Sequence, residues 1–394
     1  MTDEPDTVSE EDVVEINDDD DSWDGVLRLI NPKHSKLSAM LFFVPIAVYF
    51  GQFTHNAPMA FLTSMAAIMP LAYLMGESTE QIAIRTNESI GGLLNATFGN
   101  AAEMIICVFG VMAAASALKS GDNETANTMI SVVQASLIGS ILGNLLLVLG
   151  LAFVWGGIRH RVQSFSPTQV GANVSLLFLA VIALILPTAY DYIGDGHGDA
   201  IVTLSHLTAI VLLAMYGLFL LFQLRTHTDL FATDGGHEHE LPTMGKKQAM
   251  TLLLGSTVLV AWMAEIMVHS IDTAADELGL PTLFIGVILL PLFGNAAEHF
   301  TAVHVAAKNK MDLSFSIAVG SSTQIAVFVA PAMVIFAWFL DVPLTFQFGL
   351  FETVVTFLAV LIANAIAADG KSNWLEGAML LATYVVIGLA FFLY

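Results

Sequence analysis

The hexapeptide Phe98-Gly99-Asn100-Ala101-Ala102-Glu103 recurs unchanged, 195 residues later, as Phe293-Gly294-Asn295-Ala296-Ala297-Glu298. An identical pair of this length arises by chance on the order of once in a thousand random chains of this size, so duplication is the better explanation. Both copies lie within long apolar stretches, where a charged side chain costs at least ~2.5 kcal/mol at the centre of a bilayer. The sequence therefore predicts a duplicated membrane protein with a functional glutamate in each copy.

The composition of the whole chain agrees with a membrane location. Of its 394 residues, 56% are hydrophobic and only 12% are charged, and the mean hydropathy is +0.74. Soluble domains carry roughly 25% charged residues, so an ordinary soluble enzyme is excluded. The formal net charge of −22 argues against binding nucleic acid, which needs a basic face, and favours cations as partners. The single cysteine, Cys107, excludes a disulfide framework, a cysteine-based zinc site and a thiol redox pair.

Eleven stretches are long and apolar enough to cross a bilayer, which takes about 20 residues per helix. They cover residues 37–53, 57–76, 88–117, 129–156, 169–189, 200–224, 249–270, 281–307, 313–340, 346–367 and 374–394. We therefore expect an all-α multi-pass membrane protein with eleven transmembrane helices in the lipid bilayer and no soluble domain between them.

Two polar segments interrupt this pattern. Residues 1–24 contain twelve acidic residues and no Lys or Arg, which is typical of a disordered tail, and we place the end of this acidic cytoplasmic tail at residue 30. Residues 225–248 form an acidic cytoplasmic loop. We interpret it as a solvated loop, with a divalent-ion sensor as the less favoured alternative.

The distribution of Lys and Arg predicts the orientation, because these residues are retained on the cytoplasmic side. If the N-terminus is cytoplasmic, twelve of the thirteen Lys and Arg residues fall on cytoplasmic segments and only Lys119 lies outside. The C-terminus then lies on the outer or lumenal side. No organelle address is legible, and the composition fits a prokaryotic plasma membrane or a vacuole-like membrane.

The same topology predicts that the two hexapeptides run in opposite directions through the membrane. Inverted repeats with matching interrupted helices near the midplane are the architecture of secondary transporters. In each hexapeptide the glycine and asparagine lie four and three residues before the glutamate, so all three share one helix face. These residues are Gly99, Asn100 and Glu103 in the first copy and Gly294, Asn295 and Glu298 in the second. Glycine permits a helix break that frees backbone carbonyls as ligands, and Pro291 is expected to add to the break in the second copy.

Each hexapeptide is followed by a helix rich in small and hydroxyl residues. The candidate ligands on these helices are Ser140 and Asn144 in the first copy and Ser321, Ser322 and Gln324 in the second. A single serine more often marks tight helix packing, but buried carboxamides need polar partners.

An all-oxygen ligand set of carboxylates, carboxamides, hydroxyls and carbonyls suits a hard cation, and a flexible set suits calcium better than magnesium. Two carboxylates ~4 Å apart repel by ~4 kcal/mol at an effective dielectric constant near 20. A divalent cation or protons would relieve this repulsion, and occupancy by one excludes the other. The predicted activity is therefore exchange of Ca²⁺ for H⁺, with no cofactor.

These residues and motifs resemble the cation/proton exchanger (CAX) family of the calcium/cation antiporter superfamily over residues 30–394. The resemblance implies a Ca²⁺/H⁺ antiporter of alternating access that serves calcium homeostasis. It implies an accessory helix at 37–53 and two inverted five-helix repeats at 57–224 and 249–394. Glu103 and Glu298 would alternate between calcium and protons, and His299 would be a proton-linked residue. The remaining implied ligands are Asn100, Asn295, Ser321, Gln324 and the carbonyls of Gly99 and Gly294.

Other interpretations stay open at this point. A sodium/calcium exchanger of the same superfamily would need more acidic and hydroxyl ligands than the alanines beside the glutamates provide. A passive cation channel, with the glutamates as its filter, is the alternative from another class. We expect no enzyme, because no nucleophile–base pair or metal-activated water motif is present. The sequence leaves open whether the chain forms a homo-oligomer.

Overall fold

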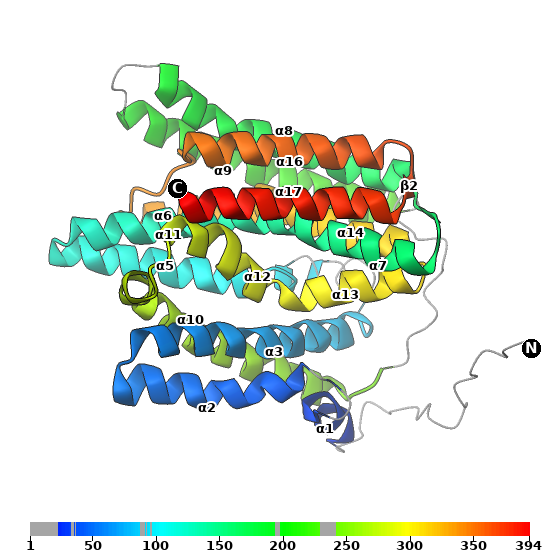
Figure 1. Cartoon of the computed structure of the whole chain (residues 1–394), viewed down its shortest axis with the longest axis horizontal. Helices are drawn as coiled ribbons and strands as arrows, with labels where there is room; N and C mark the ends of the chain where they lie inside the picture. Colours follow the sequence, from blue (N-terminus) through cyan, green and yellow to red (C-terminus); the bar gives the residue numbers. More distant parts are fainter. Residues whose placement is uncertain are drawn as a thin grey trace, which may run out of the picture.

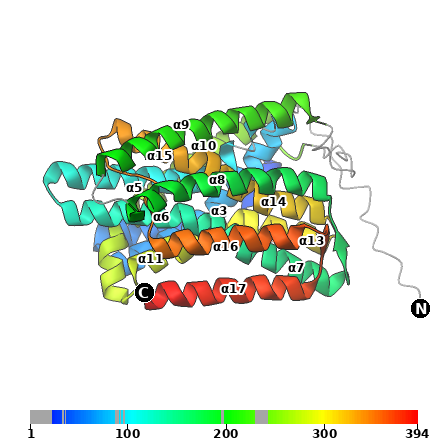
Figure 2. The same cartoon turned by 90° about the horizontal axis from the view of Figure 1, so that it is seen from above.

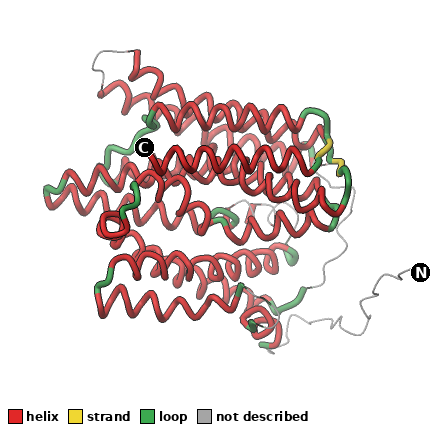
Figure 3. Tube along the Cα trace, in the orientation of Figure 1, coloured by secondary structure: helices red, strands yellow, loops and turns green. Residues whose placement is uncertain are grey.

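The computed structural model describes residues 23–32, 35, 37–86, 91, 93–94, 97–193, 198–228 and 242–394. These residues are helical almost throughout, and most of the helices run roughly along one common axis (Figures 1 and 2). The turn between α5 (Ala101–Ser120) and α6 (Asn123–Leu142) lies at one end of this axis. A short β ladder of Gln163–Ser164 and Lys371–Ser372 lies at the other (Figure 3). We call these the α5–α6 end and the ladder end.

In the described part of the first half, eight α-helical or π-helical segments and one short strand follow the N-terminal elements. The N-terminal elements are α1 (Asp24–Ile30), η2 (Ser38–Phe42), α2 (Phe43–Val48) and η3 (Tyr49–Thr54). They are followed by α3 (Ala57–Ala83), α5 (Ala101–Ser120), α6 (Asn123–Leu142), η4 (Gly143–Val148), α7 (Leu149–Arg159), β1 (Gln163–Ser164), α8 (Pro167–Ile193), α9 (Gly198–Leu221) and η5 (Phe222–Thr226).

The second half follows a similar order. Its elements are α10 (Lys246–Leu278), α11 (Thr282–Phe284), η7 (Ile285–Leu289), α12 (Leu290–Gly294), α13 (Ala296–Ala307), α14 (Met311–Gln324), η8 (Ile325–Val329), α15 (Ala330–Phe339), α16 (Leu350–Ala367), β2 (Lys371–Ser372) and α17 (Trp374–Leu393).

Among the described residues, eight helices are long and apolar enough to cross a membrane. A ninth crossing is formed by Thr282–Gly294 and Ala296–Ala307 if this pair, bent by 60°, counts as one span. Two shorter apolar helices occupy Ser38–Thr54 and Leu350–Ile366. The chain is therefore a multi-pass helical membrane protein, while eleven crossings remain a prediction.

Several predicted boundaries differ from the structure. The tail predicted over residues 1–30 overlaps α1, and residues 1–22 lie outside the described residues. The span predicted at 88–117 is interrupted at Gly99 and Asn100, which form a turn before α5. The loop predicted at 225–248 overlaps helices at both ends, because η5 continues to Thr226 and α10 begins at Lys246, and residues 229–241 lie outside the described residues. The fold is also not purely helical, since β1 and β2 pair antiparallel.

The two halves interlock instead of packing as separate bundles. Helix α3 of the first half lies along α10 of the second, and α8 packs against α14 and α16. Helix α7 packs against α13 and α17, and α9 packs against α15. Most helices of each half thus bury apolar surface against the other half.

The backbones of the two halves approach closely at Gly139 on α6 and Val287 on η7. A methyl group placed on Gly139 would lie 2.6 Å from both the Cα and the carbonyl carbon of Val287. Ala135, one turn before Gly139 on α6, faces Gly286 on η7. A methyl group on Gly286 would lie 2.5 Å from the Ala135 Cβ. Glycine is required at Gly139 because only a residue without a side chain lets the two backbones meet.

At the ladder end, the loop after α7 joins three parts of the second half. Gln163 pairs with Ser372 in the ladder, and its Nε2 donates to the Ala306 carbonyl (2.8 Å) and to Asn309 Oδ1 (3.0 Å). His160 Nε2 lies 3.0 Å from the Ala307 carbonyl oxygen. This loop therefore holds the C-terminal end of α13 in place.

At the α5–α6 end, the loop between α15 and α16 is held by the first half. Gln134 Nε2 on α6 donates to the Thr345 carbonyl (2.8 Å), and Phe348 N donates to Thr188 Oγ1 on α8 (2.9 Å). The halves are thus joined by hydrogen bonds at both ends of the molecule.

Candidate cation site

Both hexapeptides break a helix at their asparagine. Asn100 (φ −99°, ψ 20°) precedes α5 and Asn295 (φ −96°, ψ 9°) precedes α13, so the two copies adopt nearly the same backbone conformation. Glu103 and Glu298 fall in the first turn of these helices. The unpaired N–H groups of a helix N-terminus carry a partial positive charge, which stabilises a carboxylate there by roughly 0.3–1 kcal/mol.

Four side chains from both halves form one hydrogen-bonded network. Asn100 Nδ2 donates to Gln324 Oε1 (2.7 Å), and Ser321 Oγ donates to Asn100 Oδ1 (2.7 Å). Asn144 Nδ2 donates to Ser321 Oγ (3.0 Å). The network joins the break before α5, the α6–η4 junction and the end of α14, so it fixes the positions of three predicted site segments relative to each other.

The two glutamates lie next to this network and close to each other. Glu103 is only 3% exposed, and its Cγ would lie 3.8 Å from a methyl group on Gly294, in the other hexapeptide. The charge of Glu298 acts on the Glu103 carboxylate, and Ser321 lies beside the Glu298 carboxylate. The structure therefore brings the two copies of the motif face to face.

The site contains a concentration of buried polar atoms without hydrogen-bond partners. They are both carboxylate oxygens of Glu103, Oε2 of Glu298, Oγ of Ser140, both polar side-chain atoms of Asn295 and Nε2 of His299. A buried polar group without a partner costs ~1–3 kcal/mol, and a charged group costs more. A cation or protons bound among these oxygens would offset part of this cost.

The predicted site residues divide into three groups. Asn100, Asn144, Ser321 and Gln324 belong to the network. Glu103, Glu298, Gly294, Ser140, Asn295 and His299 supply the carboxylates, the close contact or the unpartnered atoms. Ser322 and Gly99 differ, because the Ser322 hydroxyl donates to Ala318 O on its own helix (3.0 Å) and Gly99 is exposed in the turn.

Sequence reasoning left Ser136 out of the candidate set. Ser136 is only 3% exposed on α6, one helical turn before Ser140. The spacing of Ser136, Ser140 and Asn144 at every fourth residue places these polar side chains on one helix face, and this pattern could have identified it.

The arrangement can bind a hard cation through mixed oxygen ligands. Among the described residues, no group of three or more His, Cys, Asp or Glu side chains is placed to hold a metal ion. A cation bound here would therefore rely on two carboxylates together with amide, hydroxyl and carbonyl oxygens. This mixture suits a hard cation better than a transition metal.

Comparison with known proteins identifies the family. The family model described as sodium/calcium exchanger protein matches residues 56–225 and 248–393, which together contain both hexapeptides. The chain belongs to the sodium/calcium exchanger protein family. The gap between the matched segments, residues 226–247, runs from the last residue of η5 to the second residue of α10.

Two curated relatives illustrate the similarity. The chain is 47% identical over 376 residues to a Ca²⁺/H⁺ antiporter of Aphanothece halophytica, covering 91% of this chain and 97% of the relative. It is 40% identical over 365 residues to a vacuolar calcium ion transporter of Schizosaccharomyces pombe, covering 91% and 85%, respectively. Among solved structures, native YfkE superposes with a TM-score of 0.76 at 38% identity and covers 91% of this chain and 100% of its own.

Proposed function

We propose that this exchanger-family protein is a Ca²⁺/H⁺ antiporter that works by alternating access. The observation that carries the proposal is the pair of glutamates, one from each hexapeptide, because three of their four carboxylate oxygens are buried without protein partners. Two facing carboxylates need a compensating positive charge, which one Ca²⁺ or protons can supply. Because both occupants use the same oxygens, binding of one displaces the other. The names of the relatives, Ca²⁺/H⁺ antiporter and vacuolar calcium ion transporter, support this choice of ions.

The proposed calcium ligands are the residues that surround the two carboxylates. They are Glu103, Glu298, Asn100, Asn144, Asn295, Ser140, Ser321, Ser322, Gln324 and the backbone carbonyls of Gly99 and Gly294. Ser322 is the weakest member, because its hydroxyl is already bonded within α14. His299, buried beside Glu298 with Nε2 unpartnered, is the proposed proton-linked residue.

The proposed architecture has eleven transmembrane helices: an accessory helix followed by two inverted repeats of five. Matching elements support the repeats, since α5 and α13 both begin after an asparagine in a helix break. The next span of each half also contains a π-helical segment, η4 in the first and η8 in the second. A π segment disturbs the regular backbone hydrogen bonding and is frequent at functional sites.

The proposed orientation has the ladder end in the cytoplasm. It follows from the twelve Lys and Arg residues that a cytoplasmic N-terminus places on that side. The membrane is the plasma membrane in a prokaryote or a vacuole-like membrane in a eukaryote. Assembly into a homo-oligomer is an open part of this proposal.

Calcium uptake into proteoliposomes tests the function. We expect an imposed pH gradient, inside acidic, to drive uptake, and a sodium gradient at equal pH to have no effect. Uptake that requires sodium would assign the chain to sodium-driven exchange. Uptake that ignores both gradients would instead indicate a channel.

A further inference from the structure

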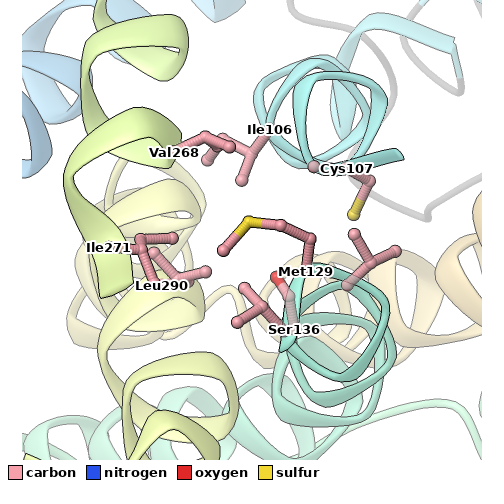
Figure 4. A pocket seen from close by; sticks show the side chains of 10 residues that line it. Ile106, Cys107, Met129, Ser136, Val268, Ile271 and Leu290 are labelled. Atoms are coloured by element: carbon pink, nitrogen blue, oxygen red, sulfur yellow. The ribbon is translucent and has the colours of Figure 1, made fainter. Parts of the chain in front are cut away.

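A small cavity lies beside the cation site, between helices of both halves. Its volume is about 10 Å³, and it lies among the side chains of α5, α6, α10 and α12. Its lining includes Cys107, Met129, Ser136, Val268, Ile271 and Leu290 (Figure 4). Most of this lining is apolar. The site described so far does not use the cavity.

The cavity continues the glutamate site toward the α5–α6 end. On α5, Cys107 lies one helical turn beyond Glu103 in this direction, and Gly110 follows on the same face. On α6, which runs the opposite way, Ser136 and Met129 lie one and about three turns before Ser140. On each of these two helices, the residues beside the buried glutamate site and the residues that line the cavity therefore lie on the same face.

On α10 the same direction leads to a group of carboxylates. Val268 lines the cavity, and Asp272 lies one turn further along the same face, with Oδ1 buried and unpartnered. The charges of Asp276, Asp122 and Glu124 act on Asp272, so acidic side chains gather where α5 and α10 end and α6 begins. Lys119, in the last turn of α5, is a basic residue at this end. The excess of negative charge raises the local concentration of cations.

Met129 blocks the cavity in this conformation. Its side chain is 3% exposed and lies in the middle of the ring formed by the other labelled side chains (Figure 4). An apolar constriction of this kind excludes water and therefore ions. The methionine side chain has three rotatable bonds, so it can clear such a space without a change in the backbone.

We propose that this cavity is the closed outer part of the ion route, which leads from the carboxylates around Asp272 to Glu103, and that Met129 is its gate. The inference rests on the proposed function and on the proposed orientation, in which the α5–α6 end is the outer one. When the route opens, Cys107 lines a water-filled passage on the outer side of the glutamates. When it is closed, the outer solution does not reach the site.

The test uses Cys107, the only cysteine of the chain, as a reporter. A charged, membrane-impermeant methanethiosulfonate reagent is added to sealed right-side-out or inverted membrane vesicles that contain the full chain during exchange. Lys119→Cys and Lys308→Cys, each in a Cys107→Ser background, mark the two faces, because both lysines are exposed at opposite ends. Exchange by the unmodified chain is measured in the same vesicles.

We expect Cys107 to react from the side that labels Lys119→Cys. Met129→Ala should accelerate this reaction at least about tenfold, because it removes the side chain that fills the cavity. Met333→Ala is the matched control: Met333 is also 3% exposed but does not line the cavity, and its substitution should leave the rate unchanged.

Two results would overturn the route while leaving the proposed function intact. In the first, an exchanging chain reacts at Cys107 only from the Lys308→Cys side. In the second, Cys107 reacts from neither side while both reference cysteines react, in which case the cavity is a packing defect. Absence of exchange in the unmodified chain would remove the proposed function and the route with it.

Discussion

Substitution of Gly139 by alanine tests how tightly the two halves must pack for exchange. The added methyl group would lie 2.6 Å from the Val287 Cα and still closer to the Val287 carbonyl oxygen. These are backbone atoms and cannot rotate away, so α6 and η7 must separate by about 1 Å to restore an ordinary contact of 3.4 Å or more. Overpacking of this kind costs ~1–3 kcal/mol, and the rigid neighbour places Gly139→Ala near the upper end of that range.

The same displacement moves Asn144, which lies further along the continuous α6–η4 segment. Its Nδ2 donates to Ser321 Oγ at 3.0 Å, and an increase of about 1 Å breaks this hydrogen bond. A misplacement of about 1 Å in a functional site can reduce a rate about 100-fold. We therefore expect Gly139→Ala to lower both the melting temperature and the rate of proton-driven calcium uptake, the latter by one to two orders of magnitude.

Gly320→Ala provides the matched control. Gly320 precedes Ser321 as Gly139 precedes Ser140, but a methyl group on Gly320 has no heavy atom within 4 Å. Because alanine favours the helix by up to about 1 kcal/mol over glycine, this variant should melt at or above the wild-type temperature and keep its uptake. The reasoning is refuted if Gly139→Ala melts and transports like the wild type, or if both variants lose activity equally.

Three further predictions concern single side chains. Glu103→Gln and Glu298→Gln should each abolish calcium uptake while preserving the melting profile, and wild-type flux in either variant would remove that glutamate from the mechanism. Asn144→Leu should slow uptake about tenfold or more, because the Ser321 hydroxyl loses a buried donor worth ~1–3 kcal/mol; an unchanged rate would mean that the network does not position the site. Asp122 caps α6 by accepting a hydrogen bond from Thr125 N (3.1 Å), which holds the pKa of its carboxyl below the usual 3.8. The ionised Asp122 cap therefore stabilises the protein above about pH 4, and this stabilisation is lost as the pH falls further. Asp122→Asn keeps the cap without a titrating charge, so it should reduce the acid-induced fall in melting temperature relative to the wild type.

The apolar spans are the part of the fold that the sequence predicts best, because length and hydropathy are local properties. The stretch predicted at 374–394, for example, is the helix Trp374–Leu393. The span predicted at 57–76 ends too early, since the helix continues to Ala83. Its last turns contain Ser78 and Thr79, whose hydroxyls donate to Leu74 O and Met75 O of the same helix, so polar residues there do not end it.

The partners within the site are harder to predict, because they depend on how the halves meet. The sequence predicts that Asn100 and Gln324 belong to one ligand set, but not which side chains bond to each other. In the structure, Asn100 of the first half donates directly to Gln324 of the second, 224 residues away. No periodicity or composition encodes such a pair. The ladder between Gln163 and Ser372 escapes prediction for the same reason, since two-residue strands leave no alternating pattern.

The hydrogen bonds that join the halves at both ends have a consequence for the covalent chain. Gln163 and Gln134 hold the second half through contacts that do not involve the segment between Thr226 and Lys246. Neither the ladder nor the Asn100–Gln324 bond needs that segment to be continuous. Two polypeptides that end and begin there would keep these contacts. An ancestral protein made of two separate subunits is therefore compatible with this architecture, and fusion would have added a connection without creating the interface.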